Sequence, residues 1–509
     1  MKWFCLFLGI LTCLPEVFGQ QVVVKPYIQP SYNKTSPELD ERLIVWFTDQ
    51  TPGDFEVEYG VKGDAVRTVK PQRQPLFFAP APTGAKLAKV DRKLAAEEGD
   101  SLSETNMVDE PVPLIPERDQ YYFKYVATLD KLPLNNDIQY RVKLRNQVVR
   151  EATFSSRASA EQSIRFVMVG DLANGKESQN EIAYQINAAR PQFLILLGDI
   201  VYSAGRMSQY MNHFWPTYNQ PAEEGPRTGA PLMATIPIYA VLGNHDAEEA
   251  KWPDYPDALA AYFLFYPGGE GPGLGPWNTP LGKNPAGASA FRRAVGKAYP
   301  GLANYSFDYG PVHFLILDSN SYVALTNVPL VRWIQSDLQN SKARWKIVSF
   351  HAPAFHTSKE HYFDQKIRRL EPIFERTGVD LVFSGHVHNY QRSKPLRFAP
   401  NSNQYLRAKN RVDGVFHIDE AFDGNSNTRP NGIIHIVSGG GGASLYSPSF
   451  EKTADYLRER FPGNWAPFTA KYYATEHSFT LLEAAPRHLL LRQLNAKGEE
   501  VDRMLITKQ

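Results

Sequence analysis

The sequence contains very little cysteine. Only Cys5 and Cys13 occur among its 509 residues, and both lie within the first twenty. We expect that stretch to be removed, so disulfides would not stabilise the mature chain, and zinc sites built from thiolates are excluded. An exported protein without cysteine suits a bacterial periplasm or cell surface better than a eukaryotic secretory pathway.

The sequence also lacks an excess of charge of either sign. Its 55 basic residues nearly balance its 54 acidic residues. No overall field therefore favours nucleic acid or an anionic membrane, and no nucleic-acid partner is evident. A functional partner must be sought in a local site, and the oligomeric state stays open.

A long apolar run is missing as well. The apolar part of MKWFCLFLGILTCLPEVFGQ, residues 1–20, is interrupted by Pro15 and Glu16, whereas a membrane-spanning helix needs about 20 apolar residues. A lysine precedes the run and Gly19 follows it, which predicts a signal peptide and a secreted or periplasmic protein. Attachment at the cell surface is the alternative, although Thr12 stands where a lipid anchor on Cys13 would usually require a smaller residue.

The pattern of apolar and polar residues changes once along the chain, near residue 159. Residues 21–158 contain short alternating runs such as FEVEYG and IQYRVKL, which predict an all-β sandwich of the fibronectin III or immunoglobulin kind. Within this domain, 84–98 shows a helical pattern and 95–112 reads as a polar loop. Residues 159–509 alternate apolar strands with amphipathic helices, which predicts an α/β domain of βαβαβ type, its sheets sandwiched and flanked by helices.

Two further features belong to the second domain. The stretches 203–237 and 247–300 are rich in glycine, proline and aromatic residues, and we expect them to form loops over one end of the sheet. The last sixty residues contain two apolar runs and a turn at 496–498, which predict a closing hairpin.

Polar side chains follow five of the predicted strands of this domain. One such residue alone is more often a helix cap or a packed histidine than a ligand. Because strand carboxyl ends face a common crevice in an open α/β sheet, these side chains should converge, and burying so many polar groups calls for a compensating partner such as a pair of metal ions. They are Asp171 in VMVGDLANG, Asp199 in LLGDIVY, Asn244, His245 and Asp246 in VLGNHD, His351 in IVSFHAP, and His386 and His388 in FSGHVHNYQR.

In this order, the blocks GDLANG, GDIVY, GNHD, SFH and GHVH resemble those of the calcineurin-like metallophosphoesterases. Tyr202, three residues after Asp199, narrows the resemblance to the purple acid phosphatases, which also place a β-sandwich before the phosphoesterase domain. The resemblance implies a binuclear metal-dependent acid phosphatase that hydrolyses phosphomonoesters by attack of a metal-bound hydroxide. The alternatives are a phosphodiesterase or nucleotide pyrophosphatase on the same site, and a surface-binding protein with an inactive domain.

The resemblance also implies the metal ligands. Asp171, Asp199, Tyr202 and His388 would hold the first ion, and these three anionic groups favour iron(III). A divalent ion, iron, zinc or manganese, would be held by Asn244, His351 and His386, with Asp199 bridging the two ions.

Further residues are implied for substrate binding and catalysis. His245 matches the histidine that contacts phosphate or protonates the leaving group, with Asp246 orienting its other ring nitrogen. Asn244 would also contact the substrate, and either His361 or His356 would supply another substrate histidine, with the spacing from His351 favouring His361. Ala173 stands where the family usually has glycine, a departure that bears on the geometry of this loop.

Overall fold

The computed structural model describes residues 22–31, 38–78, 120–248, 259–267, 271–272, 302–401, 410–446 and 449–508. The predicted signal peptide, the helical pattern at 84–98, the polar stretch at 95–112 and most of the predicted loop at 247–300 lie outside the described residues. Within those ranges, no helix has the length and apolar character needed to cross a membrane.

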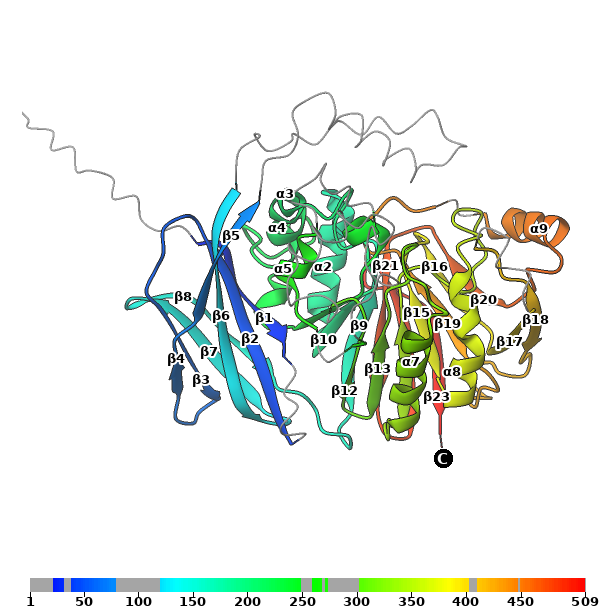
Figure 1. Cartoon of the computed structure of the whole chain (residues 1–509), viewed down its shortest axis with the longest axis horizontal. Coiled ribbons are helices and arrows are strands. Elements are labelled where there is room, and N and C mark those ends of the chain that lie inside the picture. Colours follow the sequence, from blue (N-terminus) through cyan, green and yellow to red (C-terminus); the bar gives the residue numbers. More distant parts are fainter. Residues whose placement is uncertain are drawn as a thin grey trace, which may run out of the picture.

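The N-terminal region consists of two antiparallel four-stranded sheets that share one core (Figure 1). In β3 the side chains of Phe55, Val57 and Tyr59 are buried, while the glutamates between them reach the surface, as a half-buried strand requires. Trp46 stacks on Tyr125 between the sheets, with ring centroids 5.3 Å apart. The first sheet has the order β1 (Val22–Pro30), β2 (Leu39–Thr48), β6 (Gln120–Pro133), β5 (Gln72–Phe78). The second has the order β4 (Arg67–Val69), β3 (Phe55–Val61), β7 (Asp137–Leu144), β8 (Gln147–Ser155). The strand-rich prediction is confirmed, and the narrower likeness to fibronectin III or immunoglobulin domains stays a prediction.

The C-terminal region contains two larger sheets that pack face to face. Phe166 and Phe193 of one sheet contact Phe314 of the other, with centroids 5.2 and 5.6 Å from it. The first sheet has the order β11 (Ile238–Ala240), β10 (Phe193–Leu196), β9 (Ile164–Val169), β21 (Ser478–Ala484), β22 (His488–Asn495), β23 (Glu500–Thr507). The second has the order β12 (Tyr305–Tyr309), β13 (Val312–Ile316), β14 (Trp345–Ser349), β15 (Leu381–Ser384), β19 (Ile434–Ser438), β16 (Tyr390–Ser393), β20 (Thr469–Tyr473).

Helices cover the outer faces of the two sheets. Alternate residues of a strand point to opposite faces, so Ile195 of β10 packs between the sheets while Leu194 packs with Ile182 of α2 (Glu177–Ala189). On the other side, Ile334 of α7 (Val328–Asn340) shares a core with Val348 of β14. The predicted sandwiched sheets flanked by helices are therefore present. The remaining described α-helices are α3 (Met207–Gln209), α4 (Trp215–Tyr218), α5 (Ala261–Leu264), α8 (Glu371–Thr377) and α9 (Phe450–Arg460). Short π- and 3-10 helices are η1 (Tyr210–Phe214), η2 (Leu232–Ala234), η3 (Asn244–Glu248) and η5 (Lys366–Leu370), and β17 (Leu396–Pro400) and β18 (Gly414–Ile418) form a hairpin.

One expectation about the second domain needs correction, and one is extended. The stretch 203–237, predicted as loops, contains short helices whose aromatic side chains are buried, and Trp215 lies against Tyr27 of the sandwich with centroids 4.9 Å apart. The predicted closing hairpin is present as β22 and β23, and β21 adds a third strand. β22 and β23 flank the predicted turn, but β21 pairs with β9 in the middle of the first sheet.

Candidate metal centre

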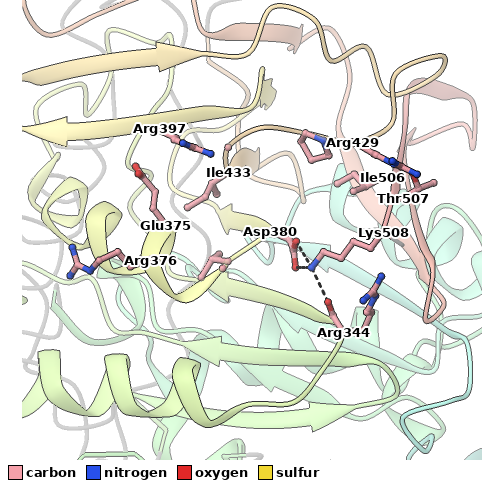
Figure 2. A pocket seen from close by; sticks show the side chains of 14 residues that line it. Arg344, Glu375, Arg376, Asp380, Arg397, Arg429, Ile433, Ile506, Thr507 and Lys508 are labelled. Carbon is pink, nitrogen blue, oxygen red and sulfur yellow. Dashed lines mark hydrogen bonds and ion pairs between the residues drawn. The ribbon is translucent and has the colours of Figure 1, made fainter.

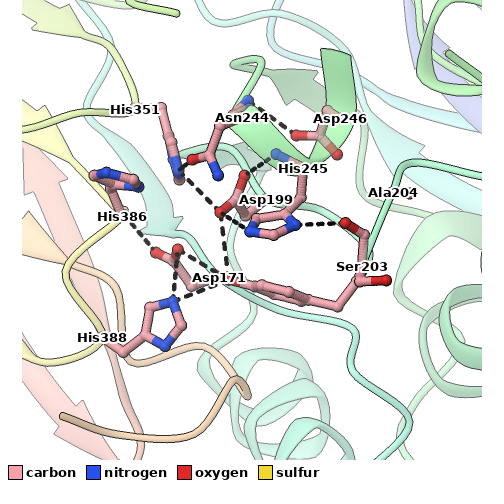
Figure 3. Close-up of polar contacts among 12 residues, drawn as sticks. Asp171, Asp199, Ser203, Ala204, Asn244, His245, Asp246, His351, His386 and His388 are labelled. Atoms are coloured by element: carbon pink, nitrogen blue, oxygen red, sulfur yellow. Dashed lines mark hydrogen bonds and ion pairs between the residues drawn. The ribbon is translucent and has the colours of Figure 1, made fainter. Parts of the chain in front are cut away.

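The polar residues predicted to converge do so, but they come from two sheets. Asp171 and Asp199 follow β9 and β10 of the first sheet, whereas His351 and His386 follow β14 and β15 of the second. The side chains at the carboxyl ends of these parallel strands point toward one another (Figure 3). The side chains therefore converge between the two predicted sandwiched sheets, and not along the end of one open sheet.

The first group of donors surrounds the hydroxyl of Tyr202. This oxygen lies 3.1 Å from Oδ1 of Asp171, 3.1 Å from Nε2 of His388 and 3.5 Å from Oδ2 of Asp199. Nε2 of His388 is 3.4 Å from Oδ1 of Asp171. All four side chains are buried, with Asp171 fully inaccessible.

The second group gathers around His351. Its Nε2 lies 3.1 Å from Oδ1 of Asn244 and 3.1 Å from Oδ2 of Asp199. The ligand atoms of Asp199, His351 and His386 all lie within 4.8 Å of one another. Asp199 thus contacts members of both groups, which is the position that the sequence analysis assigned to a bridging ligand.

Backbone carbonyls orient the histidines. Nδ1 of His351 lies 2.7 Å from the carbonyl oxygen of Leu197, and Nδ1 of His388 lies 2.8 Å from that of Ser444. Because a carbonyl can only accept, each Nδ1 carries a proton, and Nε2 is the ring nitrogen that could bind a metal ion. Metal-binding histidines are generally held in this way.

The backbone around the ligands is unusual. Asp171, Asp199 and His386 have φ values of 61°, 49° and 67°, in the left-handed region that non-glycine residues seldom adopt. Such strain collects at functional sites. Two glycines leave space for the carboxylates of these aspartates. A Cβ on Gly243 would lie 2.0 Å from Oδ1 of Asp199, and one on Gly385 would lie 2.6 Å from Oδ2 of Asp171.

Burial and neighbouring charges shift the pKa values of Asp199 and His351. Burial would raise the pKa of Asp199, but the charges of His351 and His245 hold it well below its usual range. Conversely, burial works against the charged form of His351, yet Asp199 raises the pKa of this histidine to about 9. A proton on Nε2 of His351 therefore satisfies the buried carboxylate in the apoprotein, and a metal ion would take its place.

The donor set fits a binuclear metal centre. Ligand atoms bound at about 2.0–2.2 Å to one ion lie roughly 3–3.5 Å apart, and the contacts around Tyr202 and His351 fall at this separation. The set combines carboxylates, a phenol, an amide and imidazoles, which suits iron, zinc and manganese.

His245 lies beside this centre, but Asp246 does not orient it as expected. Nδ1 of His245 is 2.5 Å from the carbonyl oxygen of Ser203, and its Nε2 is 3.8 Å from Oδ2 of Asp199. The carboxylate of Asp246 instead accepts the backbone N–H groups of Ile200 and Gly243, each at 3.0 Å. Both residues lie in a π-helix, Asn244–Glu248, and adjacent side chains on a helix do not face each other.

Of the two candidate loop histidines, the structure brings His361 to the centre. Its ring lies over that of His386, with centroids 3.9 Å apart, and its Nε2 is 3.1 Å from the hydroxyl of Tyr446. Burial lowers the pKa of His361 to about 4, so its ring is neutral above that pH. His356 packs instead against Tyr362, with centroids 5.8 Å apart, and burial lowers its pKa to about 3. Its expected contact with substrate has no support from its surroundings among the described residues.

The sequence analysis missed one aromatic residue at the site. Tyr446 stacks on His388, with centroids 4.3 Å apart and an interplanar angle of 11°. The signal for it was the glycine run before it, 439–442, where a Cβ on Gly439 would lie 2.8 Å from Oδ2 of Asp171. Ala173 causes no strain, because it forms a β-bridge with Val201 and is absent from the positive-φ positions.

Comparison with known proteins agrees with this geometry. Residues 164–390 match the calcineurin-like phosphoesterase family. The chain carries a calcineurin-like metallophosphoesterase domain. That match contains all seven candidate metal ligands.

The phosphoesterase domain has relatives among the purple acid phosphatases. Purple acid phosphatase 1 of Ipomoea batatas is 28% identical over 235 residues, 45% of this chain and 43% of the relative. The Fe(3+)-Zn(2+) purple acid phosphatase 12 of Arabidopsis thaliana is 25% identical over 235 residues, again 45% of this chain and 43% of the relative. The chain thus spans less than half the length of these two relatives.

A solved structure shares the fold over most of the chain. The purple acid phosphatase PPD1 from yellow lupin (Lupinus luteus) seeds superposes with a TM-score of 0.57 at 18% identity, covering 95% of this chain and 74% of that one. Identity at this level establishes the fold alone.

Proposed function

We propose that this chain is an exported phosphatase that hydrolyses phosphomonoesters at a centre of two metal ions, iron(III) and a divalent iron, zinc or manganese ion. The observation that carries the proposal is the position of Asp199, which contacts Tyr202 in one donor group and His351 in the other. The three oxygen donors of Asp171, Asp199 and Tyr202 favour a hard trivalent ion on their side. The Arabidopsis relative is named an Fe(3+)-Zn(2+) purple acid phosphatase, which supports the pairing of iron(III) with a divalent ion.

When bound, two such ions would neutralise the phosphoryl oxygens and lower the pKa of a coordinated water. The residues of the chain supply the rest. With Nδ1 of His245 held by Ser203, Nε2 is the atom that can hold a proton for the leaving-group oxygen. Oδ1 of Asn244 faces His351, which leaves its amide N–H groups for a phosphoryl oxygen. The neutral ring of His361 can donate one further hydrogen bond.

Asp246 has a positioning role in this proposal. By accepting the N–H groups of Ile200 and Gly243, it joins the loop that carries Asp199 to the loop that carries Asn244. Burial, with Asp199 adding to it, raises the pKa of Asp246 to about 7.

The substrate class is tested with metal-reconstituted protein on a panel of monoesters, diesters and nucleotides. We expect the highest kcat/KM for a monoester. A diester or pyrophosphate that exceeds every monoester would contradict the proposal and favour the phosphodiesterase or pyrophosphatase alternative. If no substrate of the panel is hydrolysed and the protein holds less than one metal ion per chain, the result would favour a binding protein with an inactive domain.

The role of His245 is tested by His245→Asn, with His417→Asn, an exposed histidine on β18, as the matched control. Loss of a general acid costs about 10²–10⁴-fold in kcat. The loss should be larger for alkyl than for aryl phosphates, because an aryl leaving group needs less protonation. An equal loss for both substrates would show that His245 only binds phosphate.

Export is tested separately, by sequencing the N-terminus of the protein recovered from cells and medium. We expect a mature chain that begins close to Gln20. Recovery of the unprocessed chain from the cytosol would contradict this part of the proposal and leave the catalytic part standing.

A further inference from the structure

A pocket lies at the amino ends of the parallel strands of the seven-stranded sheet, opposite the carboxyl ends that carry the candidate metal ligands. It has a volume of about 830 Å³ and is lined by the residues that precede three parallel strands, among them Arg344 before β14 and Asp380 before β15 (Figure 2). The candidate ligands His351 and His386 follow the same two strands. At about 3.3 Å per residue, the six residues from Asp380 to His386 span roughly 20 Å. The pocket is therefore separate from the metal centre.

The lining of this pocket, called the basic pocket below, is strongly cationic. It contains five basic side chains and two acidic ones, in a chain whose formal net charge is +1. Arg344, Arg376, Arg397 and Arg429 are all exposed residues of this lining. The charge is a local property of this edge of the sheet.

The two acids of the pocket are already engaged. Asp380 forms an ion pair with Nζ of Lys508 at 2.6 Å, and it also accepts the backbone N–H of Lys346. Oε1 of Glu375 accepts the backbone N–H of Phe398 at 2.7 Å. Lys508 is thereby paired with Asp380, and the four arginines outnumber the one remaining acid of the lining, Glu375.

Two of the arginines are held by neutral partners. Nε of Arg344 donates to the carbonyl oxygen of Pro486 at 3.1 Å, and Nη2 of Arg397 donates to the side-chain oxygen of Asn431. A neutral acceptor orients a guanidinium without neutralising it, and most of its five N–H donors stay available. Such a fork matches the paired oxygens of a phosphate or sulfate group.

The shape of the pocket limits the ligand. Its volume falls in the range of about 300–1,000 Å³ that is typical of small-molecule sites. Ile433 and Ile506 add an apolar part to the lining. A nucleic acid would need a long basic stripe instead of a compact pocket.

We propose that the basic pocket binds a small polyanion that carries at least two phosphate or sulfate groups. Arg344, Arg376 and Arg397 would engage these groups, with the apolar lining residues beneath the carbon skeleton of the ligand. This site is independent of the metal centre and of the proposed phosphatase activity.

The proposal is tested by calorimetry on the full metal-loaded chain at low ionic strength, with two probes. Inositol hexakissulfate represents a sulfate ester, and tripolyphosphate represents a phosphate chain. The double variant Arg344→Ala with Arg397→Ala removes two exposed guanidinium groups from the pocket. Arg458→Ala with Arg503→Ala removes two exposed arginines elsewhere and is the matched control.

We expect one site per chain for at least one probe, at least tenfold weaker binding in the pocket variant, and less than a twofold change in the control variant. Thermal unfolding and monoester hydrolysis should be unchanged in both variants. Tighter binding of one probe would assign the natural ligand to phosphates or to sulfates. No binding, full binding by the pocket variant, or equal weakening in both variants would each overturn the proposal, the last because it would show only diffuse charge attraction.

Discussion

Adding one methyl group at Gly243 should disable the metal centre. The new Cβ of Gly243→Ala would lie 2.0 Å from Oδ1 and 2.3 Å from the backbone nitrogen of Asp199, where real Cβ contacts do not fall below 3.0 Å. Asp199 must therefore move by about 1 Å. A misplacement of this size at a reacting centre costs about 10²-fold in rate, and overpacking of a buried site costs about 1–3 kcal/mol of stability.

The effect of Gly243→Ala is measured as kcat for an aryl phosphate, metal content per chain and the midpoint of thermal unfolding. Gly463→Ala is the control, because a Cβ there meets nothing within 4 Å. We expect the control to match the wild type in all three measurements. If Gly243→Ala kept its metal and more than a third of the wild-type rate, the reasoning that the backbone at Gly243 fixes Asp199 would be wrong.

Three further predictions concern single side chains. Tyr202→Phe removes the hydroxyl that contacts Asp171 and His388, so the tyrosinate-to-iron(III) absorption band of the reconstituted protein should disappear from its visible spectrum. Asn320→Ala removes the amide that donates to the carbonyl oxygen of Gly243 at 3.1 Å, and metal affinity measured by chelator competition should fall about 10–100-fold, as for other supporting residues. His313 is buried between two aspartates, which outweigh the effect of burial and raise its pKa from 6.5 to about 9. Its stabilisation is therefore complete below pH 6.5 and is lost as pH rises through 9, so denaturant unfolding should show a loss of about 3 kcal/mol over this interval that His313→Gln lacks.

Each of these predictions has an outcome that opposes it. A colourless wild-type protein that is fully active with zinc or manganese would refute the assignment of iron(III). Asn340→Ala, which changes an exposed residue of α7, is the control for Asn320→Ala and should leave metal affinity unchanged. Equal losses of metal affinity in both variants would contradict a specific role of Asn320 at the metal centre. A wild-type stability that stays flat between pH 6.5 and 9 would show that His313 is not charged in the folded protein.

The sequence predicted the ligands well because their signals are local. Each of Asp171, Asp199, His351 and His386 follows an apolar strand within three residues, and such short patterns can be read without knowing how strands pair. The helices α2 and α7 were likewise visible from their periodicity.

The sequence could not show what depends on pairing between distant segments. The insertion of β21 beside β9 joins residues 312 to 320 positions apart, and no local pattern encodes such a register. The orienting groups of the histidines are backbone carbonyls, such as those of Leu197 and Ser203, which every residue possesses. The mistaken role of Asp246 arose from treating neighbours in sequence as neighbours in space.

The origin of the donors in two sheets also constrains when the protein can acquire its metals. A growing chain exposes Asp171, Asp199 and Tyr202 about 150 residues before His351 leaves the ribosome, and β21, which borders β9, comes later still. Because synthesis proceeds from the N-terminus, a nascent chain holds only half of the ligands and an incomplete sheet. A chain exported before folding would therefore select its ions from the compartment it reaches, whatever the supply in the cytosol where it was made.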